Sequence, residues 1–287
     1  MSPQEPLPGD ESGVAPLSAA PAPDPVQPRK VPAGHGALWL VGAFYVFKRS
    51  PLIWITLLLV YLAIILVGGM IPFFGSLVIT LLSPVFAAGL MLACRDVEAG
   101  EELELPHLFA GFRNNVGQLI AVGGLYLAGS VIVIILVALL VGIVGGIGLG
   151  VSQTLTQQNG GSLDSEAGMA LLASGAGLIT LLTLALIMPL LMAYWFAPAL
   201  VALSGLDAVT AMKRSFAACW RNFTAFLVYG LAAFLLLIVA VLPLGLGLLV
   251  AFPLLTIANY TAWRDVFCPP GAQGTPSAEP APDQFPR

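Results

Sequence analysis

The sequence predicts an all-α, polytopic transmembrane helical bundle, and three observations carry this prediction. Hydrophobic residues make up 58% of the 287 residues and charged residues only 9%, whereas a soluble domain carries about 25% charged residues. The apolar residues stand in runs of about 20 or more, which is the length needed to cross a hydrocarbon core about 30 Å thick. The basic residues all fall on one side of these runs. We therefore expect a chain that crosses a membrane several times.

Six apolar runs predict six spans, at about residues 52–71, 74–94, 117–150, 169–196, 223–243 and 245–263. Pro72 and Gly75 interrupt the first pair, and Pro243 and Gly245 interrupt the last, so each of these pairs is predicted to form a tight helical hairpin. The six spans define a membrane domain of residues 31–268. Two proline- and alanine-rich tails, residues 1–30 and 269–287, flank it and are predicted to be disordered in the cytoplasm.

The eleven lysines and arginines set the direction of the spans. They lie before the first span, between the second and third, between the fourth and fifth, and after the sixth, while the three other connections contain none. Because loops rich in lysine and arginine stay in the cytoplasm, both termini are predicted to be cytoplasmic. Residues 36–49, 105–115 and 206–222 each join apolar residues to a basic end, so they are predicted to form short interfacial helices.

Three prolines align three copies of one phrase, "PVFAAGLMLACRDV" from Pro84, "PLLMAYWFAPALVA" from Pro189 and "PLLTIANYTAWRDV" from Pro253. The copies predict three parallel helical-hairpin repeats, about residues 36–97, 105–203 and 206–268, each beginning and ending in the cytoplasm. Each proline lacks a backbone N–H, so it is predicted to kink the returning helix of its repeat.

The middle repeat is about forty residues longer than the other two and lacks their Arg-Asp pair. A continuous helix over residues 117–150 would be about 51 Å long, well beyond the thickness of the hydrocarbon core. We therefore expect this hairpin to project beyond the outer surface, with a break in the helix. Gly142, Gly146 and Gly150 recur there at four-residue spacing, which favours close helix packing. A flexible break at these glycines is the alternative, and a dinucleotide-binding loop is not, because no strand precedes them.

The stretches "WLVGAFYVFKRSPLIWI" and "LLSPVFAAGLMLACRDVEAGEELELPHLFAGFRNNVG", with the six-span plan, resemble an uncharacterised family of bacterial inner-membrane proteins that have a membrane domain of unknown function. The resemblance covers about residues 31–268 and implies a six-span fold, a bacterial inner-membrane location and no established activity. More distantly, "DAVTAMKRSFAACWRNF" resembles the membrane domain of some glycerophosphodiester phosphodiesterases, but no catalytic domain of that kind is present.

The middle of each predicted span contains no Asp, Glu, Lys, Arg or His. Because an ionisable residue inside a membrane is usually functional, this counts against ion-coupled transport and against intramembrane catalysis. Four polar residues remain as candidates for a neutral ligand, a lipid headgroup or helix-to-helix hydrogen bonds: Ser83, Thr256, Asn259 and Thr261. Helix-to-helix bonding is the simpler interpretation of these residues.

Outside the spans, the sequence predicts no catalytic residue, no cofactor and no metal site. His35 and His107 have no carboxylate or cysteine at ligand spacing, so they are interpreted as isolated interfacial residues. Cys94, Cys219 and Cys268 stand far apart and are not expected to form disulfides or bind zinc. The formal net charge is −4 without a basic patch, and nothing indicates nucleic-acid binding.

Two functions fit these observations. The first is a non-enzymatic inner-membrane protein with a structural, assembly or envelope-maintenance role. Its expected partners are the lipid bilayer and either another membrane protein or a second copy of itself. It predicts that changes at Asn259 and Thr256 affect only stability. The alternative is a permease or lipid-handling protein for a neutral or amphipathic small molecule, which predicts that the purified protein retains a discrete ligand.

Overall fold

The computed structural model describes residues 26–72, 74–158 and 165–268. These ranges form helices joined by short turns, with no strand among them. The helices are α1 (His35–Phe47), α2 (Pro51–Gly69), α3 (Phe74–Glu98), the 3-10 helix η1 (Leu105–Arg113), α4 (Val116–Gln158), α5 (Ser165–Trp195), α6 (Ala197–Ser204), α7 (Ala208–Arg221), α8 (Phe223–Val241) and α9 (Leu248–Phe267). The prediction of an all-α chain is confirmed for the described residues.

Five helical segments are long and apolar enough to cross a membrane: Pro51–Gly69, Phe74–Glu98, Val116–Thr154, Gly175–Ser204 and Phe223–Val241. They fall on the first five predicted spans. The sixth predicted span, residues 245–263, falls on α9, whose second half carries Asn259, Arg264 and Asp265 and is correspondingly less apolar. The sixth crossing therefore stays a prediction, and so does the arrangement as three repeats.

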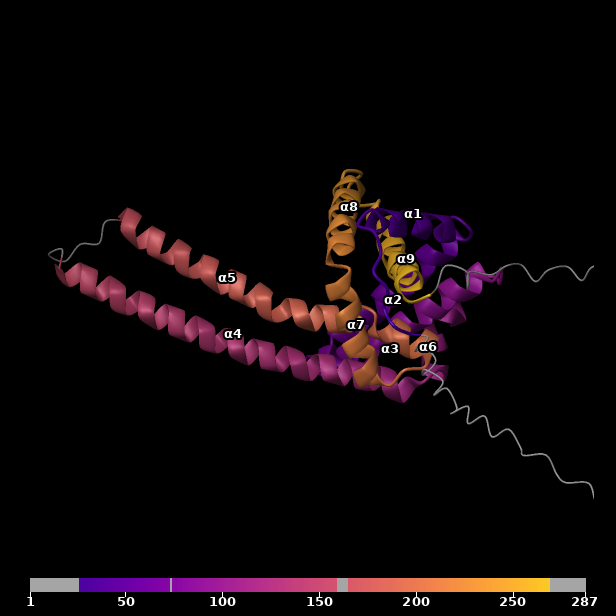
Figure 1. Ribbon diagram of the computed structural model, residues 1–287, viewed down its shortest axis with the longest axis horizontal. Coiled ribbons are helices and arrows are strands. Elements are labelled where there is room, and N and C mark those ends of the chain that lie inside the picture. The colour runs from indigo at the N-terminus through magenta and orange to yellow at the C-terminus, as the bar shows by residue number, and fades with distance from the viewer. Residues whose placement is uncertain (1–25, 73, 159–164, 269–287) are drawn as a thin grey trace, which may run out of the picture.

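Helices α4 and α5 form a long hairpin that extends away from all the other helices (Figure 1). Helix α4 has 43 residues, which corresponds to about 64 Å at 1.5 Å per residue. The predicted break near Gly150 is wrong, because α4 continues without interruption to Gln158. A glycine costs a helix only about 1 kcal/mol relative to alanine, whereas a break inside a bilayer leaves backbone groups without hydrogen bonds.

Among the described residues, none packs closely against the glycines predicted to form a packing seam. A Cβ atom added at Gly142, Gly146 or Gly150 would meet no described heavy atom within 4 Å. Close helix approach occurs instead between α3 and η1. There, a Cβ atom at Gly89 would lie 2.5 Å from the carbonyl oxygen of Leu108, so only glycine fits. The packing role of the stripe on α4 stays a prediction.

The three predicted interfacial helices all form, as α1, η1 and α7, and they also contribute to the core. Helix α1 packs against α8 and α9, and η1 packs against α3. Trp39 of α1 is 2% exposed and Leu108 of η1 is fully buried. Helix α7 begins at Asp207, whose carboxylate accepts a hydrogen bond from the Thr210 N–H at 3.0 Å and caps the helix.

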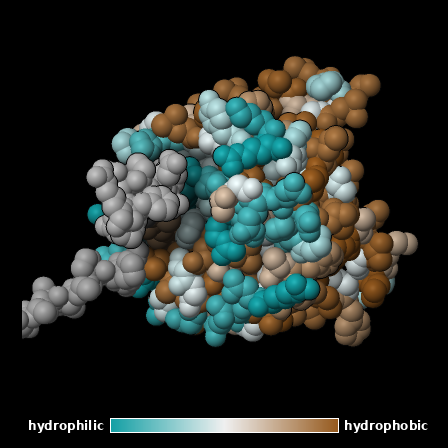
Figure 2. All heavy atoms as spheres, turned by 90° about the vertical axis from the view of Figure 1, so that its right-hand side faces the viewer, coloured by the Kyte–Doolittle hydropathy of each residue, from teal (hydrophilic) through white to brown (hydrophobic). Residues whose placement is uncertain are grey.

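The core lies where α1, α3, α6, α7 and α9 meet, at the end of the molecule from which the long hairpin departs. Trp54, Phe196 and Leu200 are among its fully buried side chains. Outside this core, α2, α4 and α8 expose leucine, isoleucine and valine side chains along most of their length. Figure 2 views the end away from the hairpin tip, where hydrophilic side chains gather across the centre and hydrophobic ones border them. This distribution suits a protein with one polar end and apolar, lipid-facing flanks.

The three aligned prolines lie inside helices as predicted, Pro84 in α3, Pro189 in α5 and Pro253 in α9. The carbonyl of Thr80, which cannot bond to the proline four residues later, accepts a hydrogen bond from the Ser83 hydroxyl at 3.1 Å. A neighbouring side chain thus partly replaces the lost backbone bond. The kinks themselves stay a prediction.

Candidate functional site

A groove of about 440 Å³ opens between α2, α3, α5, α8 and α9, and we call it the central groove. Apolar and aromatic side chains make up most of its lining. The residues that line it are Tyr61, Ala87, Leu90, Met91, Trp195, Tyr229, Ala233, Phe252, Leu255, Thr256 and Asn259. The groove therefore contacts the helices that return to the cytoplasm in all three predicted repeats, which are α3, α5 and α9. It also contacts the outgoing helices of the first and third repeats, α2 and α8.

Asn259 is the polar residue best placed to act in this groove. Its Nδ2 atom donates to the carbonyl oxygen of Trp195 at 3.1 Å, and because that carbonyl only accepts, the bond fixes which way the carboxamide points. The Asn259 Oδ1 atom is buried and has no hydrogen-bond partner among the described residues. Asn259 thus lines the groove, but its unpaired acceptor atom is enclosed by the protein.

Trp195 also lines the groove and carries an unpaired donor atom. Its Nε1 atom is also buried without a partner among the described residues. The indole ring is held in place by edge-on contacts with Phe226 and Tyr229, at ring-centroid distances of 5.8 and 6.1 Å. An unpaired buried polar group costs about 1–3 kcal/mol. Among the described residues, Trp54 and Trp263 carry unpaired buried Nε1 atoms as well, so such atoms are not confined to the groove.

The other predicted polar residues are already paired within the protein. Thr256 also lines the central groove, but its hydroxyl donates to the Phe252 carbonyl at 3.0 Å. Ser83 shares a hydrogen bond of 2.9 Å with the hydroxyl of Tyr194, and the Thr261 hydroxyl donates to the Trp39 carbonyl at 2.8 Å. Ser83 therefore joins α3 to α5, and Thr261 joins α9 to α1. Both bonds are of the helix-to-helix kind.

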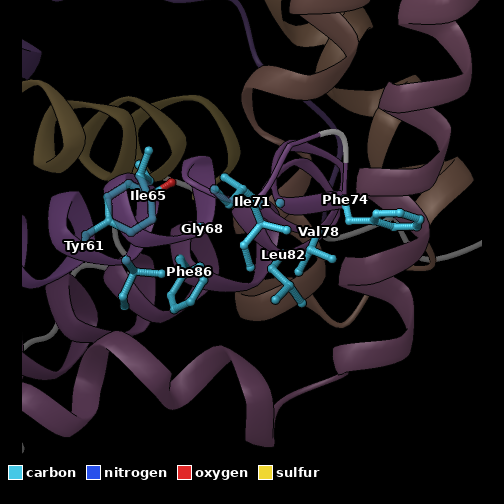
Figure 3. Close-up of a pocket in the computed structure, with 11 residues that line it drawn as sticks. Tyr61, Ile65, Gly68, Ile71, Phe74, Val78, Leu82 and Phe86 are labelled. Carbon is cyan, nitrogen blue, oxygen red and sulfur yellow. The ribbon is translucent and has the colours of Figure 1, made fainter.

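Two apolar pockets adjoin the central groove. The α2–α3 pocket holds about 220 Å³ and lies between those two helices (Figure 3), where it is lined by Tyr61, Ile65, Leu82, Phe86 and other apolar side chains. The α5–α8 pocket holds about 450 Å³, and Met188, Met192 and Phe226 are among the residues that line it. Tyr61 borders both the first pocket and the groove, and Trp195 borders both the second pocket and the groove.

A cluster of polar and charged residues around Asp265, near the end of α9, was not predicted from the sequence. The Asp265 carboxylate accepts hydrogen bonds from Arg29 Nη2 at 2.7 Å and from Trp39 Nε1 at 2.9 Å, and it contacts His35 Nδ1 at 2.8 Å. His35 is therefore not isolated, because the chain fold brings a carboxylate to it from 230 residues away. The prediction of isolation is wrong.

These contacts dock residues 26–34, which we call the strap, against α7 and α9. Asn222 accepts from the Val31 N–H at 2.8 Å and donates to the Arg29 carbonyl at 2.9 Å, and the Arg29 N–H donates to the Val266 carbonyl at 2.9 Å. Residues 26–30 belonged to the predicted disordered tail, but Arg29 at least is held in place. Residues 1–25 and the predicted C-terminal tail of residues 269–287 lie outside the described residues.

The two Arg-Asp pairs make different contacts. Arg264 forms an ion pair with Glu98 of α3 while Asp265 binds the strap, so this pair joins two parts of the molecule to α9. Asp96 pairs with its neighbour Arg95 at 2.7 Å and lies 3.6 Å from Nε2 of His107. His107 is thus also beside a carboxylate, contrary to the prediction.

The pKa of the Asp265 carboxyl lies below its ordinary value. Burial raises this pKa, but the hydrogen bonds from Trp39 and His35 and the charges of His35 and Arg29 outweigh that effect.

Burial raises the pKa of the Cys219 thiol to about 12 against a smaller lowering by Ser215, so this cysteine is a poor nucleophile. No group of three or more His, Cys, Asp or Glu residues that could hold a metal occurs within the described ranges.

Comparison with known proteins gives one informative similarity. The chain is 34% identical over 212 residues to a probable inner membrane protein of Burkholderia thailandensis, and the alignment covers 72% of this chain and 75% of the relative. No protein-family model and no solved structure matches the chain. The similarity agrees with the apolar helices in indicating an integral membrane protein, and it does not test the likeness to glycerophosphodiester phosphodiesterases.

Proposed function

Since the chain belongs to the family of this probable inner membrane protein of Burkholderia thailandensis, we propose that it is a multi-pass protein of the bacterial inner membrane that handles a neutral or amphipathic small molecule such as a lipid. One observation carries the proposal: a groove of about 440 Å³ between five helices is lined mostly by apolar and aromatic side chains, with Asn259 and Thr256 as polar residues among them. We propose no enzymatic activity.

The proposed topology has six spans, with α9 as the sixth and both termini in the cytoplasm. Each proposed repeat then consists of a short helix followed by a helical hairpin: α1 with α2 and α3, η1 with α4 and α5, and α7 with α8 and α9. The positive charges support this orientation. Reporter fusions after Gln158 and after Phe267 should report opposite sides of the membrane, and the same side for both would contradict the six-span topology.

Filling the groove tests the proposed function directly. Ala87→Phe places a phenyl ring into the groove from α3, and Ala63→Phe adds the same side chain at an exposed position of α2 as a matched control. Native mass spectrometry of protein purified in mild detergent should detect a retained lipid or other small molecule with the wild type and Ala63→Phe, but not with Ala87→Phe. Empty spectra for the wild type, in repeated preparations, would contradict the proposal.

A structural or assembly role is the second candidate, and the long hairpin favours it. The apolar window of α4 has no buried residue, and its glycine stripe has open space around it, so this surface is available to a membrane-protein partner or a second copy of the chain. Removal of part of the hairpin, residues 139–178, should then change the size of the complex in detergent while ligand retention stays the same. An unchanged size would leave the hairpin without such a role.

A further inference from the structure

A pocket of about 590 Å³ lies between η1 and the end of α3, and we call it the interfacial pocket. It shares no lining residue with the central groove or with the two pockets beside that groove. Polar and apolar side chains line it together: Asp96, Leu105, Pro106, His107, Phe109, Ala110 and Arg113. In the proposed six-span topology, η1 lies on the cytoplasmic side, so the interfacial pocket is at the level of the lipid headgroups.

Two groups of opposite charge in this pocket can take a further partner. The Arg113 side chain is exposed and makes no ion pair or hydrogen bond with the described residues. Asp96 uses its Oδ1 atom to pair with Arg95 Nη2 at 2.7 Å. Its Oδ2 atom lies 3.6 Å from His107 Nε2, which is longer than a hydrogen bond. The interfacial pocket thus offers a cation and a carboxylate oxygen that can each bind a ligand.

An apolar path leads from the interfacial pocket into the α2–α3 pocket. Phe109 lines the first, and its ring centroid lies 6.0 Å from that of Phe86, which lines the second. From Phe86, the α2–α3 pocket extends along α3 past Leu82 and Val78 to Phe74 (Figure 3). Twelve residues of helix correspond to about 18 Å, and half of a hydrocarbon core is about 15 Å thick. The path is therefore long enough for one acyl chain of one leaflet.

The charges in the interfacial pocket specify the head of such a lipid. A phosphate is the anion that an arginine binds best, and a primary ammonium donates hydrogen bonds to a carboxylate. A phosphoglycerol head offers no positive charge to Asp96, and the acidic residues Glu101, Glu102 and Glu104 just before η1 repel its net negative charge. A phosphocholine head carries the positive charge but has no N–H to donate. A phosphoethanolamine head satisfies both groups.

We infer that the interfacial pocket binds a phosphoethanolamine lipid of the inner leaflet. The lipid phosphate accepts from Arg113, its ammonium donates to Asp96 Oδ2, and one acyl chain passes Phe109 into the α2–α3 pocket. This inference goes beyond the proposed function, which concerns the central groove. Leu105 and Phe109 are 46% and 45% exposed, so the interfacial pocket is open and its lipid exchanges with detergent during purification. Binding is therefore measured after lipid is added.

Three phospholipids with the same acyl chains test the inference. Wild-type protein is stripped of lipid in detergent and titrated with dioleoyl phosphatidylethanolamine, phosphatidylcholine or phosphatidylglycerol, and the bound fraction is measured by native mass spectrometry. We expect phosphatidylethanolamine to bind about fivefold more tightly than the other two, because it alone offers a charged N–H donor to Asp96. Equal or tighter binding of either other lipid would overturn the inference.

Two variants assign the roles of the head-binding residues. Arg113→Gln should weaken binding of all three lipids about tenfold, because each carries the phosphate. Asp96→Asn should instead abolish the preference for phosphatidylethanolamine over phosphatidylcholine, and a preserved preference would contradict the ammonium contact. Arg221→Gln is the matched control, because Arg221 is also exposed in the last turn of a short helix before a span but does not line the interfacial pocket. Equal binding by Arg113→Gln and Arg221→Gln would contradict the phosphate contact.

A second pair of variants tests the place of the acyl chain. Val78→Trp fills the α2–α3 pocket, and Leu77→Trp adds the same side chain one position away, outside the pocket lining. Phosphatidylethanolamine binding should weaken several-fold in Val78→Trp alone, and equal binding by the two variants would overturn the inference. Thermal unfolding of each variant checks its folding, and if Val78→Trp does not fold, the two head variants decide.

Ala87→Phe separates the inference from the proposed function, because it fills the central groove and leaves the interfacial pocket unchanged. The preference for added phosphatidylethanolamine should persist in this variant. Its loss would place the lipid in the central groove and overturn the inference, while the proposed function would stand. If the wild type shows the preference but its spectra are empty before lipid is added, the inference stands and the proposed function fails.

Discussion

Asp265→Asn should release the strap from α9 while the rest of the fold stays intact. The carboxylate accepts from three donors, Arg29, His35 and Trp39, at 2.7 to 2.9 Å. Asparagine keeps the shape of the side chain but removes its charge. It also turns an NH₂ group toward at least one of the donors, because an amide carries only one acceptor oxygen.

The magnitude follows from the number of donors and their exposure. Hydrogen bonds to charged groups contribute about 1.5–3 kcal/mol and neutral ones about 0.5–1.5 kcal/mol, so removal of the charge costs about 1 kcal/mol per donor. The Arg29 side chain is 33% exposed and that of Asp265 is 18% exposed, so solvent screening reduces the Arg29 contribution. We therefore expect strap docking to weaken by about 2 kcal/mol, which is about 30-fold in the docking equilibrium.

Limited trypsin digestion measures this equilibrium at the bond between Lys30 and Val31. Val31 is 5% exposed and its N–H is bonded to Asn222, so the bond is protected while the strap is docked. The rate of cleavage should rise about 30-fold in Asp265→Asn, because cleavage tracks the open population. Asp96→Asn is the matched control, since it changes the other Arg-Asp pair without contacting the strap. An unchanged rate in Asp265→Asn would refute the reasoning.

Three further predictions concern other sites. The pKa of Asp265 in the folded protein lies below its ordinary value near 4, so strap docking should be fully stable above about pH 5 and weaken as the pH falls through 4. Hydrogen exchange of the Val31 amide measures strap docking, and in Asp265→Asn the exchange should lose this pH dependence. Gly89→Ala should lower the free energy of unfolding by about 2 kcal/mol or more, because the new Cβ atom would clash with η1. Gly142→Ala should be neutral or raise the free energy of unfolding by up to about 1 kcal/mol. Thermal unfolding in detergent compares the two variants. A maleimide should modify half-exposed Cys268 well before buried Cys219, and equal rates by mass spectrometry would contradict the described burial.

Local hydropathy was sufficient to predict the helices. The apolar runs placed the segments that became α2, α3, α4, α5 and α8, because a sustained run of apolar residues has few alternatives to a helix in a membrane. The three short helices were also found, since each combines apolar residues with a basic end. Helix α4 is longer than predicted, because the requirement to satisfy backbone hydrogen bonds keeps its glycine-rich segment helical.

Long-range pairing was not predictable from one sequence. His35 and Asp265 are 230 residues apart and Glu98 and Arg264 are 166 apart, and neither distance leaves a local spacing signal. The groove shows the same limit. Asn259 was a candidate because it is an amide in a predicted span, but nothing in the sequence singles out its partner Trp195. Only the fold shows that both line one groove with unpaired atoms.

The contacts of Arg264 and Asp265 also bear on the order of biosynthesis. Both residues lie in the last described helix, while their partners, the strap and α3, leave the ribosome much earlier. The first hairpin must therefore wait in the membrane with Glu98 and Arg29 unpaired until α9 is made. Chains truncated before α9 should therefore leave the strap undocked, because Asp265, to which Arg29 binds, is missing.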